Sequence, residues 1–265
     1  MCGILCYLGK RQALPILLEG LRKLEYRGYD SSGLALAEDG KVFCQRAVGK
    51  IQALENSLAG VQWKGSSGIA HTRWATHGKP TEANAHPHAD CKERIFVIHN
   101  GIIENFQSLK ATLLERGHQF RSETDSEVLA HLIEEHYQGD LAEAVRDALG
   151  LVEGTYGIGV LSAENPQEIV VARKGSPLIL GIGEGEIFAA SDVSALVSHT
   201  KEVIYLQDED VAVIHPGGYL LSNLNSDSIL RQTQKVDWDV AAAEKQGFPH
   251  FMLKEIYEQP EAVEN

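Results

Sequence analysis

The sequence predicts an α+β fold in which antiparallel sheets pack face to face and helices cover the outside. Two observations lead to this fold class. Residues 157–234 consist mostly of short β-runs separated by Gly, Asp and Pro turns, and the N-terminal third holds further β-runs. Between these strand-rich segments, residues 106–149 place apolar side chains at helical spacing. Hydrophobic residues make up 43% of the chain, enough for a buried core.

The N-terminal third is predicted to alternate strands and helices. A stripe of leucines from Leu14 to Leu24 indicates an amphipathic helix, and Pro15 is compatible with its first turn. Around this helix we expect a buried strand at residues 4–8, a loop at 27–33, hairpin strands at 34–37 and 42–46, a short helix at 51–58 and a strand at 68–71.

The later elements follow from the same kinds of signal. Thr124 and Glu127 have the spacing of a capping box, which predicts a helix start, and Gly117 is placed to end the preceding helix. In chain order we expect a long polar loop at 72–92, a strand at 94–99, helices at 106–116, 128–133 and 141–149, and strands at 158–161, 169–172, 178–182, 187–190, 203–206 and 211–214.

The composition argues against several classes of function. A net charge of −13 without any Lys/Arg block makes nucleic acid and anionic membranes poor partners. No apolar stretch reaches the roughly 18 residues of a membrane helix, and no signal peptide is evident, so we expect a cytoplasmic protein. Its four cysteines should then be reduced, and without a Cys-x-x-Cys pair we expect no structural zinc.

Cys2 is the first candidate for catalysis. If Met1 is removed, Cys2 carries both a thiol and a free α-amine. An α-amine with an ordinary pKa of about 7.7–8.0 can accept a proton at neutral pH, and a nucleophile activated by the terminal amine is an established catalytic arrangement. The alternative is a small buried thiol at the start of a strand, which position alone leaves open.

Asn100 and Gly101 are candidates for an oxyanion hole. They follow an apolar strand, where a side-chain amide and an adjacent backbone N–H can point at one spot. That geometry suits the tetrahedral intermediate of acyl transfer. The alternative from the dipeptide alone is an ordinary Asn-Gly turn.

Two charged residues are candidates for substrate binding. Arg73, early in the long polar loop, has a guanidinium suited to gripping a carboxylate through two parallel hydrogen bonds. Asp125, at a predicted helix start, can receive a substrate ammonium. The alternatives are a solvated arginine beside a packed Trp and a first-turn acid favoured by the helix dipole.

Five histidines invite a metal interpretation, namely His71, His77, His86, His88 and His99. The pair His86 and His88 can supply two ligands. Their spacing matches no zinc signature, however, and no carboxylate stands at a helical offset from them. We therefore expect neither a metal nor another cofactor.

Six ordered segments resemble the glutaminase domains of glutamine–fructose-6-phosphate aminotransferases, within the wider family of class II, or N-terminal-nucleophile, amidotransferases. The segments are residues 2–4, 25–33, 71–78, 84–88, 99–105 and 122–127. The tail at 254–260 resembles the segment that leads into the sugar-phosphate domains of those enzymes. The resemblance covers nearly the whole chain and implies a four-layer αββα sandwich of the N-terminal-nucleophile hydrolase type.

The resemblance implies a catalytic role for three residues. Cys2 is the implied nucleophile, with its own α-amine as base, and Asn100 with the Gly101 N–H is the implied oxyanion hole. The implied reaction is hydrolysis of L-glutamine to glutamate and ammonia. In the family this is the ammonia-donating half of glucosamine 6-phosphate synthesis from fructose 6-phosphate.

Five further residues acquire implied binding roles. Arg73 is expected to bind the α-carboxylate of glutamine, and Asp125 its α-ammonium. Thr76 and His77 are expected to line the same pocket, partly through their backbone. Trp74 stands where the family gates ammonia transfer.

The resemblance also implies a domain organisation. We expect the glutaminase domain at residues 2–235 and a linker at 236–265 toward sugar-isomerase domains that this sequence lacks. The full-length enzyme is expected to be a homo-oligomer. Two alternatives stay open at this point. One is the glutaminase domain of another class II enzyme, such as the phosphoribosylpyrophosphate amidotransferase, and the other is a non-catalytic regulatory domain of the same fold.

Overall fold

The computed structural model describes residues 2–38, 40–75 and 78–237 and, in the tail, 252–254, 256–257 and 259. Its first sheet consists of β1 (Gly3–Leu8), β2 (Ser31–Glu38), β3 (Lys41–Val48), β4 (Ser67–Arg73), β9 (Ile179–Gly183), β10 (Glu186–Ala190), β11 (Glu202–Tyr205) and β14 (Gln234–Lys235). Its second sheet consists of β5 (His88–Ala89), β6 (Ile95–Ile103), β7 (Gly154–Ser162), β8 (Ile169–Lys174), β12 (Val211–His215) and β13 (Gly218–Ser222).

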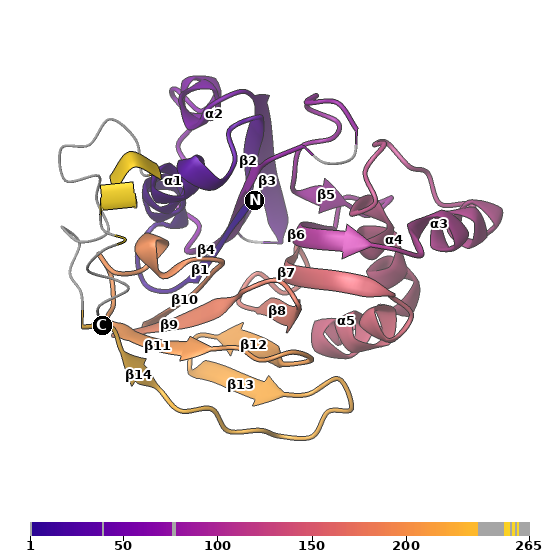
Figure 1. The fold of residues 1–265 in the computed structure, drawn as a ribbon. Helices are drawn as coiled ribbons and strands as arrows, with labels where there is room; N and C mark the ends of the chain where they lie inside the picture. Colours follow the sequence, from indigo (N-terminus) through magenta and orange to yellow (C-terminus); the bar gives the residue numbers. More distant parts are fainter. Residues whose placement is uncertain are drawn as a thin grey trace.

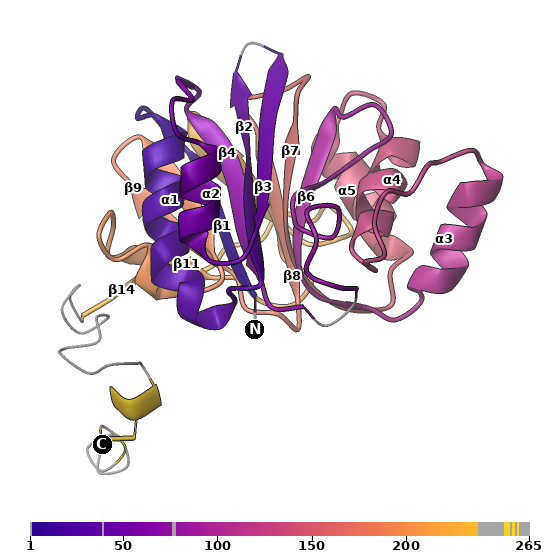
Figure 2. The same ribbon diagram turned by 90° about the horizontal axis from the view of Figure 1, so that it is seen from above.

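Neighbouring strands run antiparallel in both sheets, in the orders β14-β11-β9-β10-β1-β4-β2-β3 and β13-β12-β8-β7-β6-β5. The helices are α1 (Ala13–Leu24), α2 (Ile51–Ser57), α3 (Phe106–Glu115), α4 (Glu127–His136) and α5 (Leu141–Gly150), with short 3-10 turns η1 (Glu25–Arg27) and η2 (Val193–Ala195). Helices α1 and α2 cover the first sheet, α4 and α5 cover the second, and α3 packs on α4 (Figures 1 and 2).

Three hydrophobic layers separate these four layers of secondary structure. Strand β1 shows how one short sequence serves two of them. Leu5 and Tyr7 face α1, whereas Ile4, Cys6 and Leu8 face the second sheet. Because the strand is buried on both faces, it reads as an unbroken apolar run. The third layer lies between the second sheet and the helices α4 and α5. The predicted α+β fold and four-layer sandwich are confirmed.

Cys6 belongs to the layer between the sheets. It is fully buried, and burial raises the pKa of its thiol well above the ordinary range. A Cβ atom added at Gly159 on the facing strand would lie 2.5 Å from the Cys6 sulfur. The glycine therefore leaves room for this side chain, and Cys6 is a packing residue.

Three sequence predictions about element ends were wrong, each because backbone pairing extends a strand beyond its apolar run. The predicted loop at 27–33 ends early, because Ser31 pairs with both Val48 and Arg73 as the first residue of β2. Arg73 is the last residue of β4 rather than part of a loop. The strand at 94–99 continues through Asn100 and Gly101, which pair with β7. Strands β5, β13 and β14 were not predicted.

The predicted capping box at Thr124 is also wrong. Helix α4 has Ser126 at its N-cap, without a side-chain cap hydrogen bond. The Glu127 carboxylate instead accepts hydrogen bonds from the backbone N–H groups of Arg121 and Ser122, at 2.8 and 2.7 Å. Glu127 thus ties down the loop before α4. The helix end predicted at Gly117 is confirmed, since Gly117 follows α3 with φ of +95°.

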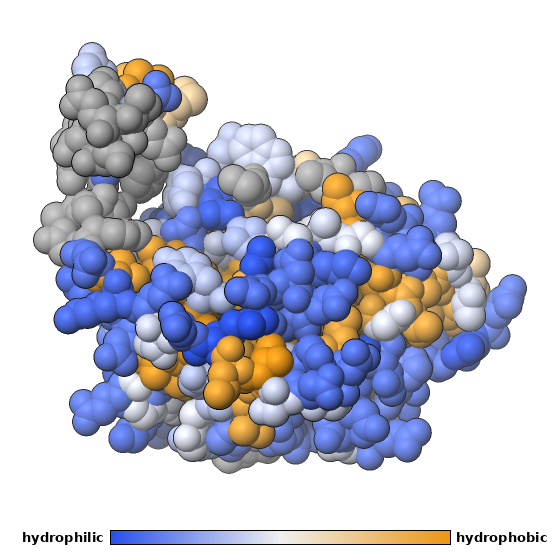
Figure 3. Space-filling view, turned by 60° about the horizontal axis from the view of Figure 1, so that its bottom comes forward, coloured by the Kyte–Doolittle hydropathy of each residue, from blue (hydrophilic) through white to orange (hydrophobic). Residues whose placement is uncertain are grey.

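The surface is largely hydrophilic on the face drawn in Figure 3, where hydrophobic atoms form separate patches. No described helix has the length and apolar character needed to cross a membrane. The expected linker, residues 236–265, falls mostly outside the described residues, so the domain boundary stays a prediction.

Candidate active site

Cys2 lies immediately before β1, between the neighbouring strands of the first sheet. Its sulfur accepts a hydrogen bond from the Trp74 N–H at 3.2 Å and lies 3.5 Å from the Trp74 carbonyl oxygen. Trp74 directly follows β4, whose Thr72 pairs with Gly3. Strand pairing therefore sets the position of the thiol against a backbone N–H.

The surroundings of Cys2 control the charge of its sulfur. Burial raises the pKa of the thiol, and the Trp74 N–H and the Arg73 guanidinium offset only part of that rise. The resting group is therefore a thiol rather than a thiolate at neutral pH. A nucleophilic role for Cys2 then requires a nearby base to take the proton.

The second sheet brings Asn100 to the same place. The Asn100 Nδ2 donates a hydrogen bond to the Cys2 carbonyl oxygen at 3.1 Å. The Asn100 Oδ1 accepts from His71 Nε2 at 3.0 Å. His71 is fully buried, and burial lowers its pKa to about 3, so the imidazole is neutral. Holding Oδ1 in this way leaves the amide N–H groups of Asn100 directed toward Cys2.

Gly101 lets the backbone of β6 approach β7 closely. Its φ is +144°, and an added Cβ atom would lie 2.1 Å from the Thr155 carbonyl oxygen. Only glycine fits without a rearrangement. The alternative of an Asn-Gly turn was wrong, because both residues lie within β6 and Gly101 lines the cleft beside Cys2.

Arg73 and Asp125 lie in the same cleft. Arg73 is 4% exposed and donates to the carbonyl oxygens of Gly78 and Lys79, both at 3.3 Å. Burial lowers the pKa of its guanidinium, and the nearby carboxylates of Asp30 and Asp125 oppose that shift. The surface-arginine alternative for Arg73 is thus wrong.

The carboxylate of Asp125 is 5% exposed and is held from two sides. Its Oδ2 accepts from the Ile103 N–H at 2.8 Å, and its Oδ1 lies 3.4 Å from the Ser126 hydroxyl. Asp125 precedes α4, so it is not a first-turn residue of that helix. A buried cation and a buried anion therefore line one cleft.

The cleft is small and charged. Its lining consists of Cys2, Arg73, Trp74, His86, His99, Gly101, Thr124, Asp125 and Ser126. A larger hollow of about 480 Å³ lies near Leu8, at the other end of β1, against β9, β10 and the β12–β13 turn. Its lining includes neither a cysteine nor an arginine. The chemistry of the side chains, rather than the size of the cavity, thus identifies the candidate site.

Three further residues, Trp74, Thr76 and His77, were predicted to line the pocket. Trp74 is 44% exposed, and its ring meets the ring of Tyr29 edge-on at 5.5 Å between centroids. Thr76 and His77 lie outside the described residues.

Sequence reasoning gave no role to two residues that position the site. Arg27 donates from Nε to the Cys2 carbonyl oxygen at 3.3 Å and pairs with Asp192 at 2.8 Å. Asp30 accepts from the Ala75 N–H at 2.7 Å, which holds the segment after β4. Both residues belong to the segment 25–33 that carries the family resemblance. In the sequence, the feature that could have identified these two positioning residues is a pair of charged side chains in a Gly-rich loop.

The histidines of the site do not gather as a metal site. The His86 ring packs at a tilt against His71 and edge-on against His88, with ring centroids 4.1 and 4.5 Å apart. Burial lowers the pKa of each, so these rings are neutral. Within the described residues, the single cluster with metal-ligand spacing lies elsewhere, around Cys91.

Comparison with known proteins relates the chain to one family. The model of the glutamine amidotransferase domain family matches residues 57–237. The chain is 53% identical over 265 residues to an isomerizing glutamine–fructose-6-phosphate aminotransferase of Thermus thermophilus, and 49% identical over 263 residues to that of Aquifex aeolicus. These alignments cover 100% and 99% of this chain but 44% of each relative, so the chain spans less than half of their length.

A solved structure gives the corresponding comparison of folds. Glutamine phosphoribosylpyrophosphate amidotransferase from B. subtilis, complexed with ADP and GMP, superposes with a TM-score of 0.74 at 26% identity. The superposition covers 86% of this chain and 50% of that chain. At about half the identity of the sugar-enzyme relatives, this likeness does not favour the phosphoribosylpyrophosphate alternative.

Proposed function

The chain belongs to the glutamine amidotransferase domain family, a family of enzymes, and on that premise we propose that it hydrolyses L-glutamine to glutamate and ammonia through Cys2. The observation that carries the proposal is the convergence of the Cys2 sulfur, the Asn100 amide, Arg73 and Asp125 on one cleft from both sheets. No single segment of the chain contains this set.

The first step requires a base beside the thiol. With Met1 removed, the α-amine of Cys2 takes the thiol proton, and the sulfur attacks the side-chain amide carbon of glutamine. The carbonyl oxygen becomes an oxyanion. Donors from Asn100 Nδ2 and the Gly101 N–H stabilise that charge, a contribution worth about 10²–10³ in rate per donor in other enzymes.

The intermediate then collapses to products. The amine returns the proton to the leaving nitrogen, ammonia departs, and a γ-glutamyl thioester remains on Cys2. Water attacks this thioester, the thiol regains its proton, and glutamate is released. Atoms and charges balance with water as the one co-reactant.

The clamp for the amino-acid end of glutamine consists of Arg73 and Asp125. Arg73 binds the α-carboxylate and Asp125 the α-ammonium. Both side chains are already buried and held by backbone groups, so little conformational freedom is lost on binding. Trp74, Thr76 and His77 complete the pocket in this proposal.

The chain is further proposed to serve a larger enzyme. Residues 2–235 form the glutaminase domain, and 236–265 lead toward sugar-isomerase domains that use the ammonia to make glucosamine 6-phosphate. The supporting observation is about 50% identity to glutamine–fructose-6-phosphate aminotransferases over the whole chain. We place this enzyme in the cytoplasm as a homo-oligomer.

Retention of Met1 tests the role of the amine. We expect a variant that keeps Met1 to release glutamate from glutamine far more slowly than the chain that begins at Cys2, because a peptide nitrogen cannot take the proton. Intact mass establishes which N-terminus each preparation carries. Full glutamate release by a preparation that retains Met1 would exclude the amine as the base.

A further inference from the structure

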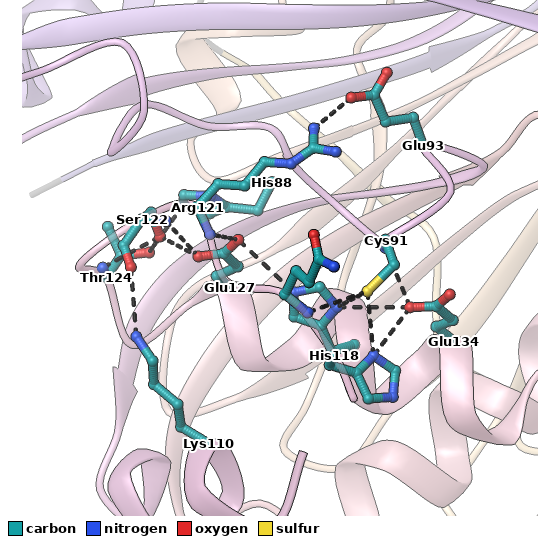
Figure 4. Close-up of polar contacts among 12 residues, drawn as sticks. His88, Cys91, Glu93, Lys110, His118, Arg121, Ser122, Thr124, Glu127 and Glu134 are labelled. Atoms are coloured by element: carbon teal, nitrogen blue, oxygen red, sulfur yellow. Dashed lines mark hydrogen bonds and ion pairs between the residues drawn. The ribbon is translucent and has the colours of Figure 1, made fainter. Parts of the chain in front are cut away.

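A second cysteine lies in a cluster of metal-ligating side chains outside the catalytic cleft. Cys91 follows β5, His118 lies in the loop after α3, and His131 and Glu134 stand one turn apart on α4. One ligand atom from each side chain lies within 4.8 Å of all the others. Figure 4 shows the Cys91 sulfur directed toward His118 and Glu134.

The separations in the cluster match those of a tetrahedral zinc ion. Bond lengths of about 2.3 Å to sulfur and 2.0–2.2 Å to nitrogen or oxygen place tetrahedral ligands about 3.3–3.6 Å apart. The Cys91 sulfur is 3.5 Å from Nδ1 of both His118 and His131. The Glu134 Oε2 is 3.1 and 3.6 Å from the same two nitrogens.

The contact between His118 and Glu135 turns the other ring nitrogen of His118 toward the centre of the cluster. His118 Nε2 lies 2.8 Å from the Glu135 carboxylate, which can only accept, so Nε2 carries the hydrogen. In a neutral ring, Nδ1 then presents a lone pair to the cluster. The Glu134 Oε2 and the Cys91 sulfur each accept one backbone N–H, from Cys91 at 3.1 Å and from Gln119 at 3.4 Å, and both atoms keep further lone pairs. A cation at the centre would receive lone pairs from the sulfur, the carboxylate and Nδ1 together.

The outer side of the His118 imidazole has the support that zinc ligands usually receive. A ligating histidine typically donates its other N–H to a carboxylate, which fixes the ring. His118 has Glu135 in that position. The Nε2 of His131 lies 3.7 Å from Glu127 and has no hydrogen-bond partner among the described residues, although His131 is 1% exposed.

We propose that Cys91, His118, His131 and Glu134 bind one Zn²⁺ ion as a structural site. One thiolate with two imidazoles and a carboxylate suits zinc, whereas Mg²⁺ and Ca²⁺ prefer oxygen ligands alone. Four protein ligands leave no open position for a substrate. This proposal departs from the expectation, drawn from the sequence, that the chain holds no metal.

The ion would join three segments that lie apart in the sequence. It would clamp the β5–β6 loop and the loop after α3 onto helix α4. Asp125 of the glutamine clamp lies just before that helix. Zinc should therefore stabilise the second sheet with its helices, and it should affect glutamine hydrolysis only indirectly.

The test is metal binding by the Cys2→Ala chain, which lacks the catalytic thiol as a competing ligand. After treatment with a chelator and its removal, the chain is titrated with Co²⁺ and then with Zn²⁺. We expect one equivalent of Co²⁺, a thiolate-to-cobalt charge-transfer band, the intense visible bands of tetrahedral cobalt, and displacement by one equivalent of Zn²⁺. The unfolding temperature should rise with zinc concentration.

Matched variants locate the ion. Adding Cys91→Ser should abolish the charge-transfer band, and Cys44→Ser, which changes another half-buried cysteine, should not. Adding His131→Gln should weaken zinc binding by more than about 100-fold, and His136→Gln on the same helix should leave it unchanged. Circular dichroism monitors folding, and Glu134→Gln replaces any variant that does not fold.

Three results would overturn the proposal. One is a folded Cys2→Ala chain that binds neither metal stoichiometrically. Another is a charge-transfer band that persists in the Cys91→Ser variant. The third is an unfolding temperature that does not change with zinc. In these cases the cluster is a hydrogen-bonded network in which a protonated His118 bridges Glu134 and Glu135.

Discussion

The surroundings of Cys2 and Cys91 use similar residue types for different purposes. Around Cys2, a backbone N–H contacts the sulfur, and the nearby histidines are neutral and turned to other partners. Around Cys91, the Gln119 N–H also contacts the sulfur at 3.4 Å, but two imidazole nitrogens approach it as well, both at 3.5 Å. A nucleophile needs donors placed around an open cleft, whereas a cation needs converging lone pairs. The direction of the neighbouring groups, more than their identity, separates the two sites.

Replacing each of the two cysteines in turn should give the largest effects. Cys2→Ala should lower glutamate release by more than about three orders of magnitude, because the covalent route needs the sulfur. Its stability cost should be about 1 kcal/mol, since one partly exposed sulfur is removed. Cys91→Ser should show the reverse pattern, with a lower unfolding temperature and most of the activity retained.

Glutamate assays and thermal unfolding on both variants measure this contrast. Cys44→Ala serves as the control and should be nearly silent in both. If Cys2→Ala kept activity within tenfold of wild type, Cys2 would not be the nucleophile, and the proposed difference between the two cysteine sites would be wrong.

Asn100→Ala should produce the next largest effect. Removing one oxyanion donor is expected to lower kcat by about 10²–10³ while KM changes little, because the donor acts on charge that develops in the transition state. Steady-state kinetics with glutamine measures both constants. A rise in KM at constant kcat would instead assign Asn100 to ground-state binding.

Arg73→Ala and Asp125→Asn should have smaller and substrate-dependent effects. A charged hydrogen bond left unpaired costs roughly 1–3 kcal/mol or more, so kcat/KM for glutamine should fall about tenfold to several hundredfold. A primary amide without α-amine and α-carboxylate should be a poor substrate for wild type. It should also be almost insensitive to either change. Equal losses on both substrates would mean that the pair holds the site together rather than reading the substrate.

The sequence was a good guide where local pattern decides structure. The leucine stripe of α1 and the apolar run of β1 were correctly assigned, because burial on defined faces dictates their periodicity. Residue types made Cys2 and Asn100 candidates, and the family resemblance then implied that they act in one reaction. Their meeting is now seen in the hydrogen bond from the Asn100 amide to the Cys2 carbonyl oxygen.

What the sequence could not provide depends on pairing between distant segments. The strand positions of Arg73 and Gly101 follow from partners on β2 and β7, which no local window contains. The Cys91 cluster draws its ligands from residues 91, 118, 131 and 134, a spacing that matches no short zinc motif. Its single local signal is the pair His131 and Glu134, three residues apart on a helix.

The stability of the protein in acid should depend on the buried His71, which contacts Asn100. The pKa of His71 is lowered by burial to about 3, against about 6.5 when unfolded. The unfolded chain therefore binds the extra proton, and this residue's stabilisation is complete above pH 6.5 and declines toward pH 3. Between these limits, the contribution of His71 to the free energy of unfolding changes by up to about 1.4 kcal/mol per pH unit.

The substitution His71→Gln should lower the slope of the unfolding free energy against pH by the amount that one bound proton contributes. Urea unfolding between pH 6.5 and 4, with a chelator present and in the Cys91→Ser background, isolates the effect from metal release. An unchanged slope would indicate that His71 titrates normally in the folded protein.

The most direct test of the central claim is to find the acyl group during turnover. Enzyme mixed with glutamine is quenched in acid, digested and analysed by mass spectrometry. The account predicts a γ-glutamyl thioester on the peptide that begins at Cys2, formed in wild type and in Cys91→Ser and missing from Cys2→Ala. Continued glutamate release by Cys2→Ala, with the glutamyl group on another residue, would contradict it.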